Sequence, residues 1–163
     1  LIMGKQTKIP VVALRYFLSY GPRQSPTNPY TGVCSLFATQ LLQNKKPTIY
    51  EDGLQTRDFV YVEDIADANI FVMESAKANN RVFNVGTAKP TTIIYVAETI
   101  AKLLGKKPEF IIGQDYRLGD VRHIVADSST LQKLGFTPKV GFEEGMQRYV
   151  DWLKMESEKI SVV

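Results

Sequence analysis

Several arginines lie next to glycine, proline or aspartate residues, at expected junctions between loops and strands. They are Arg23, Arg57, Arg117 and Arg122. Arginine presents a planar guanidinium that can grip a phosphate group with two parallel hydrogen bonds. Two such residues on separate segments could clamp a diphosphate between them. The alternative for any one of them is an exposed or ion-paired surface arginine, which is the commoner situation for a charged side chain.

The sequence contains no complete set of catalytic residues. The glycine-rich pattern Gly-x-Gly-x-x-Gly, the NTPase phosphate loop and a Tyr-x-x-x-Lys pair are all absent, and Tyr149 and Lys154 are one residue too far apart. The single histidine, His123, and the single cysteine, Cys34, exclude a histidine-rich or cysteine-only metal site and an internal disulfide. We predict no metal site, a structural or solvent-facing His123, and a Cys34 that is packed rather than nucleophilic.

The chain has 163 residues, of which 44% are apolar, and a formal net charge of +3. This length and composition suit one domain with a hydrophobic core. The charges are too few and too scattered to indicate nucleic acid, and no apolar run approaches the roughly 20 residues of a membrane span. We therefore expect a soluble, cytoplasmic protein that binds neither nucleic acid nor membrane. Because the chain begins with Leu1, we expect it to be part of a longer protein.

Strand and helix patterns alternate along the chain, which predicts an α/β fold. Nearly continuous apolar runs, typical of strands buried on both faces, occur at 11–17 and 82–86. Shorter strands are expected at 47–50, 59–62 and 109–112. Residues 18–31 are rich in Gly, Pro, Ser and Asn, and are expected to form a long loop.

Apolar residues at helical spacing predict five helices in the rest of the chain. Their expected starts are Gly32, Glu63, Thr91 or Thr92, Asp127 or Ser128, and Phe142. The buried face of the second is expected to carry Ile65, Ala68, Val72, Met73 and Ala76. Asp64 and Asp67 are expected to be helix-start and surface charges rather than a general-base pair.

Five motifs occur in an order that resembles the C-terminal half of NAD-dependent nucleotide-sugar epimerases and dehydratases, the extended short-chain dehydrogenase/reductase family. They are LRYFLSYGPRQ at 14–24, NPYTGV at 28–33, EDGLQTRDFVYVEDI at 51–65, VFNVG at 82–86 and RLGDVRH at 117–123. The resemblance covers essentially the whole chain. It implies an incomplete Rossmann sheet, to which 1–22 and 52–90 contribute, and a small α/β substrate-binding domain formed mainly by 23–51 and 91–163.

The resemblance also assigns roles to particular residues. It implies that Arg57 and Arg117 reach the substrate diphosphate, and that Thr48 and Tyr50 lie along the nucleotide base. Residues that would approach the nucleotide with their backbone are Thr31, Gly32 and Val33. Tyr16 falls where the family meets the nicotinamide end of NAD. Leu18 departs from the family, which commonly has a substrate-holding asparagine there, so that contact either comes from elsewhere or is lost.

The function implied is a 4-epimerase of UDP- or dTDP-linked hexoses, deoxyhexoses included, in which NAD takes a hydride and returns it through a 4-keto intermediate. The alternatives are a 4,6-dehydratase or decarboxylase of the same family, or a non-catalytic nucleotide-sugar- or NAD-sensing protein. The glycine loop and the catalytic Tyr-x-x-x-Lys pair are expected upstream of Leu1, in an N-terminal NAD-binding half. We therefore predict no catalytic residue in this chain, no activity for the chain alone, and a homodimer when the protein is complete.

Overall fold

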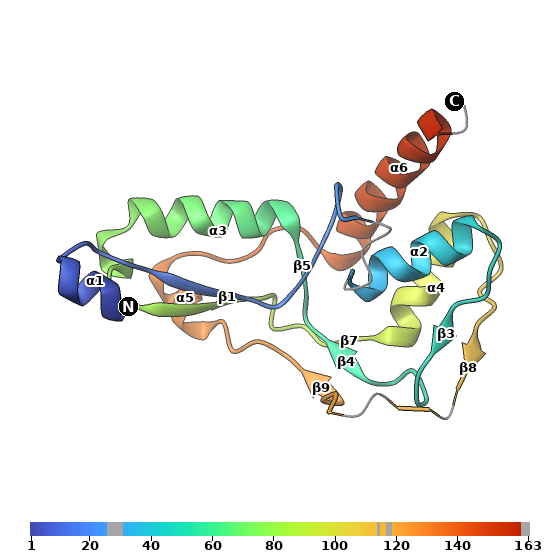
Figure 1. Cartoon of the computed structure of the whole chain (residues 1–163), viewed down its shortest axis with the longest axis horizontal. Helices are drawn as coiled ribbons and strands as arrows, with labels where there is room; N and C mark the ends of the chain where they lie inside the picture. Colours follow the sequence, from blue (N-terminus) through green and yellow to red (C-terminus); the bar gives the residue numbers. More distant parts are fainter. Residues whose placement is uncertain (26–30, 114, 117–118, 161–163) are drawn as a thin grey trace.

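The computed structural model describes residues 1–25, 31–113, 115–116 and 119–160, with side chains to 156. It shows a mixed α/β fold with short, mainly parallel strands, which confirms the predicted fold class (Figure 1). The molecule is elongated, with one group of elements around β1 and α3 and another around α2, α4 and α6. No helix in the described part of the chain is long and apolar enough to cross a membrane.

The first group is built on a parallel pair of strands, β1 (Ala13–Tyr16) and β6 (Val82–Val85). Helix α3 (Val62–Glu74) and the short helix α5 (Ser129–Leu134) pack on this pair and bury an apolar cluster. Its buried members are Val60, Ile65, Ala68, Val72, Ala78, Phe83, Val85, Leu131 and Phe136. A short helix, α1 (Ile2–Thr7), precedes β1, and a 3-10 turn at Ala76–Ala78 follows α3. Within the described residues, β1 pairs only with β6, so its other edge is open.

The second group contains α2 (Val33–Leu42), α4 (Ile93–Leu103) and α6 (Phe142–Ile160), which share the larger core. A parallel pair of two-residue strands, β3 (Thr48–Ile49) and β8 (Ile111–Ile112), lies beside α2 and α4. As expected, Thr92 caps α4, because its hydroxyl accepts a hydrogen bond from the Tyr95 N–H at 3.3 Å.

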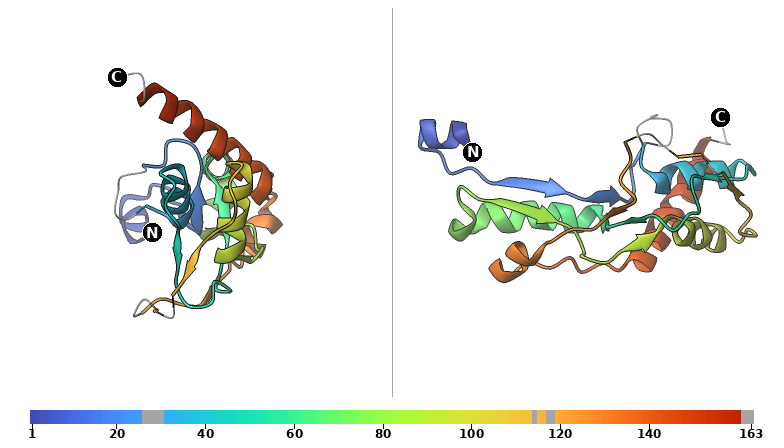
Figure 2. Two further views of the ribbon diagram at one scale, coloured as in Figure 1. Left: turned by 90° about the vertical axis from the view of Figure 1, so that its right-hand side faces the viewer. Right: turned by 90° about the horizontal axis from the view of Figure 1, so that it is seen from below.

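Two further strand sets join the groups and position the site described below. Strand β2 (Leu18–Tyr20) runs parallel to β5 (Phe59–Tyr61). Strand β4 (Thr56–Arg57) is antiparallel to β7 (Thr91–Thr92) and parallel to β9 (His123–Ile124). Residues distant in sequence therefore meet at β4, near which Figure 1 labels β7 and β9, and Figure 2 shows the same fold from two other sides.

Two expectations about the elements are wrong. Leu18–Tyr20 form β2 rather than the start of a loop, because the chain stays extended after β1 and changes partner strand. The Phe17 N–H still donates to Val85 of β6, whereas the Leu18 N–H donates to Asp58 beside β5. Met73 and Ala76 were both expected on the buried face of α3, but both are exposed, Met73 at 83%. Met73 lies at the margin of the apolar stripe, and α3 ends at Glu74, before Ala76.

Asp64 is also more than a helix-start charge. It is buried, and its two carboxylate oxygens accept hydrogen bonds from the backbone N–H groups of Lys139 and Val140 at 2.8 and 3.1 Å. These contacts fasten the segment before α6 to the first turn of α3. Asp67 is an exposed charge, as expected, with Lys139 Nζ 3.6 Å away.

Candidate functional site

A cavity of about 350 Å³ opens between β3, β4 and the N-terminal ends of α2 and α4. Its lining residues come from segments far apart in sequence. They are Leu18, Thr31, Gly32, Val33, Leu36, Phe37, Thr48, Ile49, Tyr50, Gln55, Arg57, Ile93 and Asp120. The fold thus brings together every predicted substrate-binding residue except Arg117, which lies outside the described residues.

Among the described residues that line this cavity, Arg57 is the one cationic side chain, and it is only 12% exposed. One terminal nitrogen, Nη1, donates to the carbonyl oxygens of Thr56 at 2.8 Å and of Arg122 at 3.0 Å. The other, Nη2, donates to the Asp120 carboxylate at 2.8 Å. A guanidinium has five N–H donors. The contacts within the described residues use three of them, so the side chain is held in place and still has donors for a ligand.

The neighbouring Asp58 does not pair with the arginine but fixes the backbone around it. Asp58 is fully buried. Its carboxylate accepts hydrogen bonds from the Thr87 N–H at 2.8 Å, the Thr87 hydroxyl at 2.6 Å and the Ala88 N–H at 2.8 Å. A fourth comes from the Ala126 N–H at 3.1 Å. The Asp58 carboxylate therefore joins the chain next to Arg57 to two other segments, Thr87–Ala88 and Ala126.

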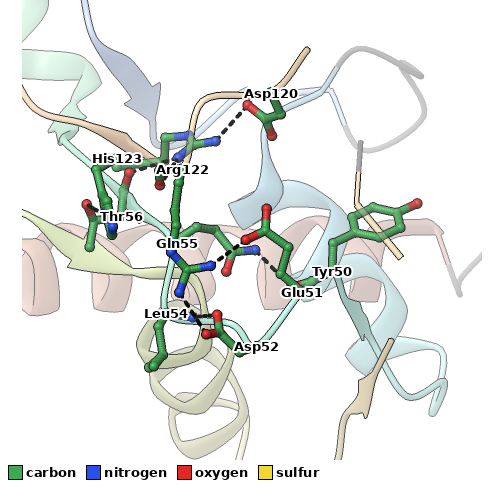
Figure 3. A network of polar contacts seen from close by, with 10 residues as sticks. Tyr50, Glu51, Asp52, Leu54, Gln55, Thr56, Asp120, Arg122 and His123 are labelled. Carbon is green, nitrogen blue, oxygen red and sulfur yellow. Dashed lines mark hydrogen bonds and ion pairs between the residues drawn. The ribbon is translucent and has the colours of Figure 1, made fainter. Parts of the chain in front are cut away.

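The segment that carries Asp120 is fastened to the turn between β3 and β4 (Figure 3). The Arg122 guanidinium pairs with both Glu51 and Asp52, the latter at 2.7 Å. This hydrogen bond holds the pKa of the Asp52 carboxyl below its usual range. His123, an exposed residue as predicted, shares a 2.9 Å hydrogen bond between its Nδ1 and the Thr56 hydroxyl.

Gln55 is a member of the cavity that the sequence did not reveal. It is 7% exposed, and its Nε2 donates to the Tyr50 carbonyl at 3.0 Å, as Figure 3 shows. It thereby braces the backbone of Tyr50, whose side chain is exposed. No local pattern could have identified it, because Gln55 precedes β4 and that strand has only two residues.

The N-terminus of α2 faces the cavity through Thr31, Gly32 and Val33. Gly32 is the N-cap, and no side chain there caps the helix. The first turn contains no acidic residue. Free N–H groups and the helix dipole make such an end attractive to anions. This end and Arg57 therefore give the cavity two sources of positive potential.

The remaining wall is apolar and is formed by Leu18, Val33, Leu36, Phe37 and Ile93. Leu18 also lines a second cavity of about 340 Å³. That cavity includes Phe17, Ser19, Gln24 and Ser25, and it shares Thr31 and Gly32 with the first. A ligand longer than the first cavity could extend past Leu18 into the second.

Tyr16, the predicted cofactor contact, lies apart from this cavity. It is 48% exposed at the end of β1, and its hydroxyl donates to Asn69 Oδ1 at 2.9 Å. A groove of about 690 Å³ lies beside it, between β1 and α3. The sequence contains no Gly-x-Gly-x-x-Gly loop of the kind that holds a dinucleotide diphosphate, and the role of Tyr16 as a cofactor contact stays a prediction.

Cys34, the single cysteine of the chain, is not placed as a nucleophile. Cys34 is buried inside α2, and burial raises the pKa of its thiol. Within the described residues, no group of three or more His, Cys, Asp or Glu side chains could hold a metal ion.

Known proteins resemble this chain in sequence and in fold. The chain is 37% identical over 154 residues to a dTDP-L-rhamnose 4-epimerase of Burkholderia thailandensis, covering 94% of this chain and 42% of that protein. The crystal structure of a Thermotoga maritima UDP-glucose 4-epimerase with UDP-glucose matches with a TM-score of 0.88 and 32% identity, over 96% of this chain and 50% of that one.

A UDP-N-acetylglucosamine 4-epimerase from Methanobrevibacter ruminantium, in complex with UDP-N-acetylmuramic acid, matches with a TM-score of 0.88 and 38% identity, over 95% of this chain and 49% of that one. Other relatives are dehydratases and decarboxylases, and some related structures contain NAD. The chain spans about half the length of the curated relatives it matches.

The model of the NAD-dependent epimerase/dehydratase family matches residues 1–86, more than half of the chain. The sequence resemblance, the parallel-strand fold and the matching structures agree with that match. The chain belongs to the NAD-dependent epimerase/dehydratase family.

Proposed function

We propose that this chain is the substrate-binding portion of a nucleotide-sugar 4-epimerase that acts on a UDP- or dTDP-linked hexose. The observation that carries the proposal is the Arg57 guanidinium, which is held in the cavity by three hydrogen bonds and retains free donors within the described residues. The substrate diphosphate would accept those donors.

The rest of the cavity suits the other parts of such a ligand. The uncapped N-terminus of α2 would add a second attraction for the diphosphate. Thr48 and Tyr50, called the base wall below, line the same cavity as Arg57 and would contact the nucleotide base. Arg117 is proposed as the second phosphate-binding arginine. The sugar would extend past Leu18 toward the second cavity.

In this proposal the chain supplies binding energy away from the reacting carbon, and that energy holds the hexose in place for the reaction. NAD, an NAD-binding half and the Tyr-x-x-x-Lys pair would belong to a portion of the protein that precedes Leu1. We further propose that the complete protein is a cytoplasmic homodimer and that Tyr16 lies near the cofactor. Residues 1–22 and 52–90 would complete the Rossmann part, while 23–51 and 91–163 would form most of the substrate-binding domain.

The second candidate is a dehydratase or decarboxylase of the same family. It is favoured by relatives with those activities, among them dehydratases and a decarboxylase at 30–32% identity. These enzymes would need the same diphosphate and base contacts, so the cavity is compatible with them. A nucleotide-sugar sensor would also bind the ligand, but without turnover.

Calorimetry and product analysis on the full-length gene product test the proposal. We expect UDP- and dTDP-hexoses to bind in the micromolar to millimolar range, with uridine and thymidine far weaker. We also expect conversion between sugars that differ only at C4. Release of water or carbon dioxide from the sugar would support the second candidate, binding without turnover would indicate a sensor, and absence of diphosphate-dependent binding would contradict all three.

A further inference from the structure

Arg122 connects the turn after β3 to the phosphate-binding arginine. Its guanidinium pairs with the carboxylates of Glu51 and Asp52, as Figure 3 shows. Its main-chain carbonyl accepts hydrogen bonds from the Thr56 N–H at 3.0 Å and from the Arg57 guanidinium at 3.0 Å. Arg122 thus contacts both the turn that follows Tyr50 of the base wall and the Arg57 side chain, which is assigned to the diphosphate.

The turn that Arg122 contacts contains a residue with an unfavourable backbone conformation and is held by hydrogen bonds both within the turn and from outside it. Glu51 has a φ of 52°, in the left-handed region that residues with a β-carbon rarely adopt. Its N–H donates to the Asp115 carbonyl at 2.9 Å, and the Asp52 carboxylate accepts the Leu54 N–H at 3.0 Å. Without Arg122, two adjacent carboxylates would repel each other in this turn.

We propose that Arg122 is a positioning residue for nucleotide binding, which fixes the spacing between the base wall and the Arg57 guanidinium by gripping Glu51 and Asp52. The inference rests on the proposed function, because it assigns that spacing to a nucleoside diphosphate. A nucleoside diphosphate gains binding free energy from its base and its diphosphate together only when the base wall and the Arg57 guanidinium are already held at the distance that separates those two parts of the ligand.

Fold stability is not the main role of these ion pairs. The Arg122 side chain is 43% exposed, and both acidic partners are also accessible. Ion pairs of this kind contribute little to stability in water. Removing the guanidinium would leave the main-chain carbonyl of Arg122 and the β4–β9 pairing in place. The expected consequence is therefore a loosened turn in a folded protein.

The chain contains a matched control. Arg148 also bridges two carboxylates, those of Glu63 at 3.1 Å and Glu144 at 2.6 Å, and its side chain is 45% exposed. It does not line the cavity. Arg148→Met therefore removes the same charge and the same number of ion pairs as Arg122→Met, without touching the turn.

The test uses the full-length gene product and three probes: UDP, uridine and inorganic pyrophosphate. We expect Arg122→Met to weaken UDP binding about fivefold to twentyfold, while uridine and pyrophosphate binding each change less than about twofold. Arg122→Lys should recover part of the loss, because one ammonium can pair with one of the two carboxylates. Arg148→Met should leave the binding of all three probes unchanged.

Two results would overturn the inference: a loss for UDP no larger than in Arg148→Met, or a loss for UDP that equals the combined losses for uridine and pyrophosphate. The second would mean that Arg122 acts on one end of the ligand rather than on the spacing. If the wild-type protein binds no nucleoside diphosphate, the proposed function itself fails, which is a different outcome from an insensitive Arg122→Met.

Discussion

Removal of the Arg57 guanidinium should separate diphosphate binding from nucleoside binding. A hydrogen bond to a charged group is worth about 1.5–3 kcal/mol, which corresponds to about tenfold to a hundredfold in affinity. We expect Arg57→Ala to weaken UDP and dTDP binding by that factor. Arg57→Lys should restore only part of it, because lysine keeps the charge but lacks the planar fork.

The structure also shows a complication in this experiment. In Arg57→Ala, the Asp120 carboxylate loses its partner at 2.8 Å and would face the diphosphate as an unpaired anion. Some of the loss would then come from repulsion rather than from the missing donors. The double variant Arg57→Ala with Asp120→Asn separates the two, and it should bind UDP more tightly than Arg57→Ala while remaining weaker than wild type.

Calorimetry of UDP, dTDP and uridine against wild type and these variants measures the effect. Uridine serves as the control ligand, since it lacks phosphate and its weak binding should change little. If Arg57→Ala binds UDP as tightly as wild type does, then Arg57 is only the ion-pair partner of Asp120. The proposed orientation of the ligand would then be wrong.

Three further predictions concern the apolar wall, the buried carboxylate and the open strand edge. Leu18→Asn should strengthen binding of a nucleotide hexose by about twofold to tenfold through a new hydrogen bond worth about 0.5–1.5 kcal/mol. An equal change in the binding of UDP, which lacks the hexose, would place Leu18 away from the hexose. Asp58→Ala should lower the free energy of unfolding by about 3 kcal/mol or more, because it leaves buried donors unpaired. Asp67→Asn, at an exposed site, should change it by less than about 0.5 kcal/mol. Equal effects of the two substitutions in urea denaturation would contradict the stabilising role of Asp58. The 163-residue chain alone should self-associate through the open edge of β1, and a stable monomer in sedimentation would refute this. The same chain should show no sugar turnover, and turnover above a buffer control would refute that.

The longer elements could be predicted from the sequence because their patterns extend over several turns or strand positions. Helix α4 shows this well, with a cap at Thr92 and buried Val96 and Ile100. The two-residue strands could not be predicted. At Thr56–Arg57 no periodic pattern can develop, and β4 exists only because β7 and β9 supply partners from distant parts of the chain.

The candidate site shows the same division. The family resemblance selected residues that the fold does gather in one cavity, although their role in binding stays a prediction. Local sequence gave no sign that Asp120 would pair with Arg57 or that Arg122 would grip Glu51 and Asp52, because these contacts join residues 63 to 71 positions apart. Long-range ion pairs of this kind have no local pattern, and they are what determines how Arg57 and the base wall are held.

The binding mode of the nucleotide can be seen in a crystal structure of the full-length gene product with a UDP-hexose. We expect diphosphate oxygens within hydrogen-bonding distance of the Arg57 guanidinium, the base against Thr48 and Tyr50, and the hexose beyond Leu18. A nucleotide bound elsewhere, with the Arg57–Asp120 pair unchanged and the cavity empty of ligand, would contradict this binding mode.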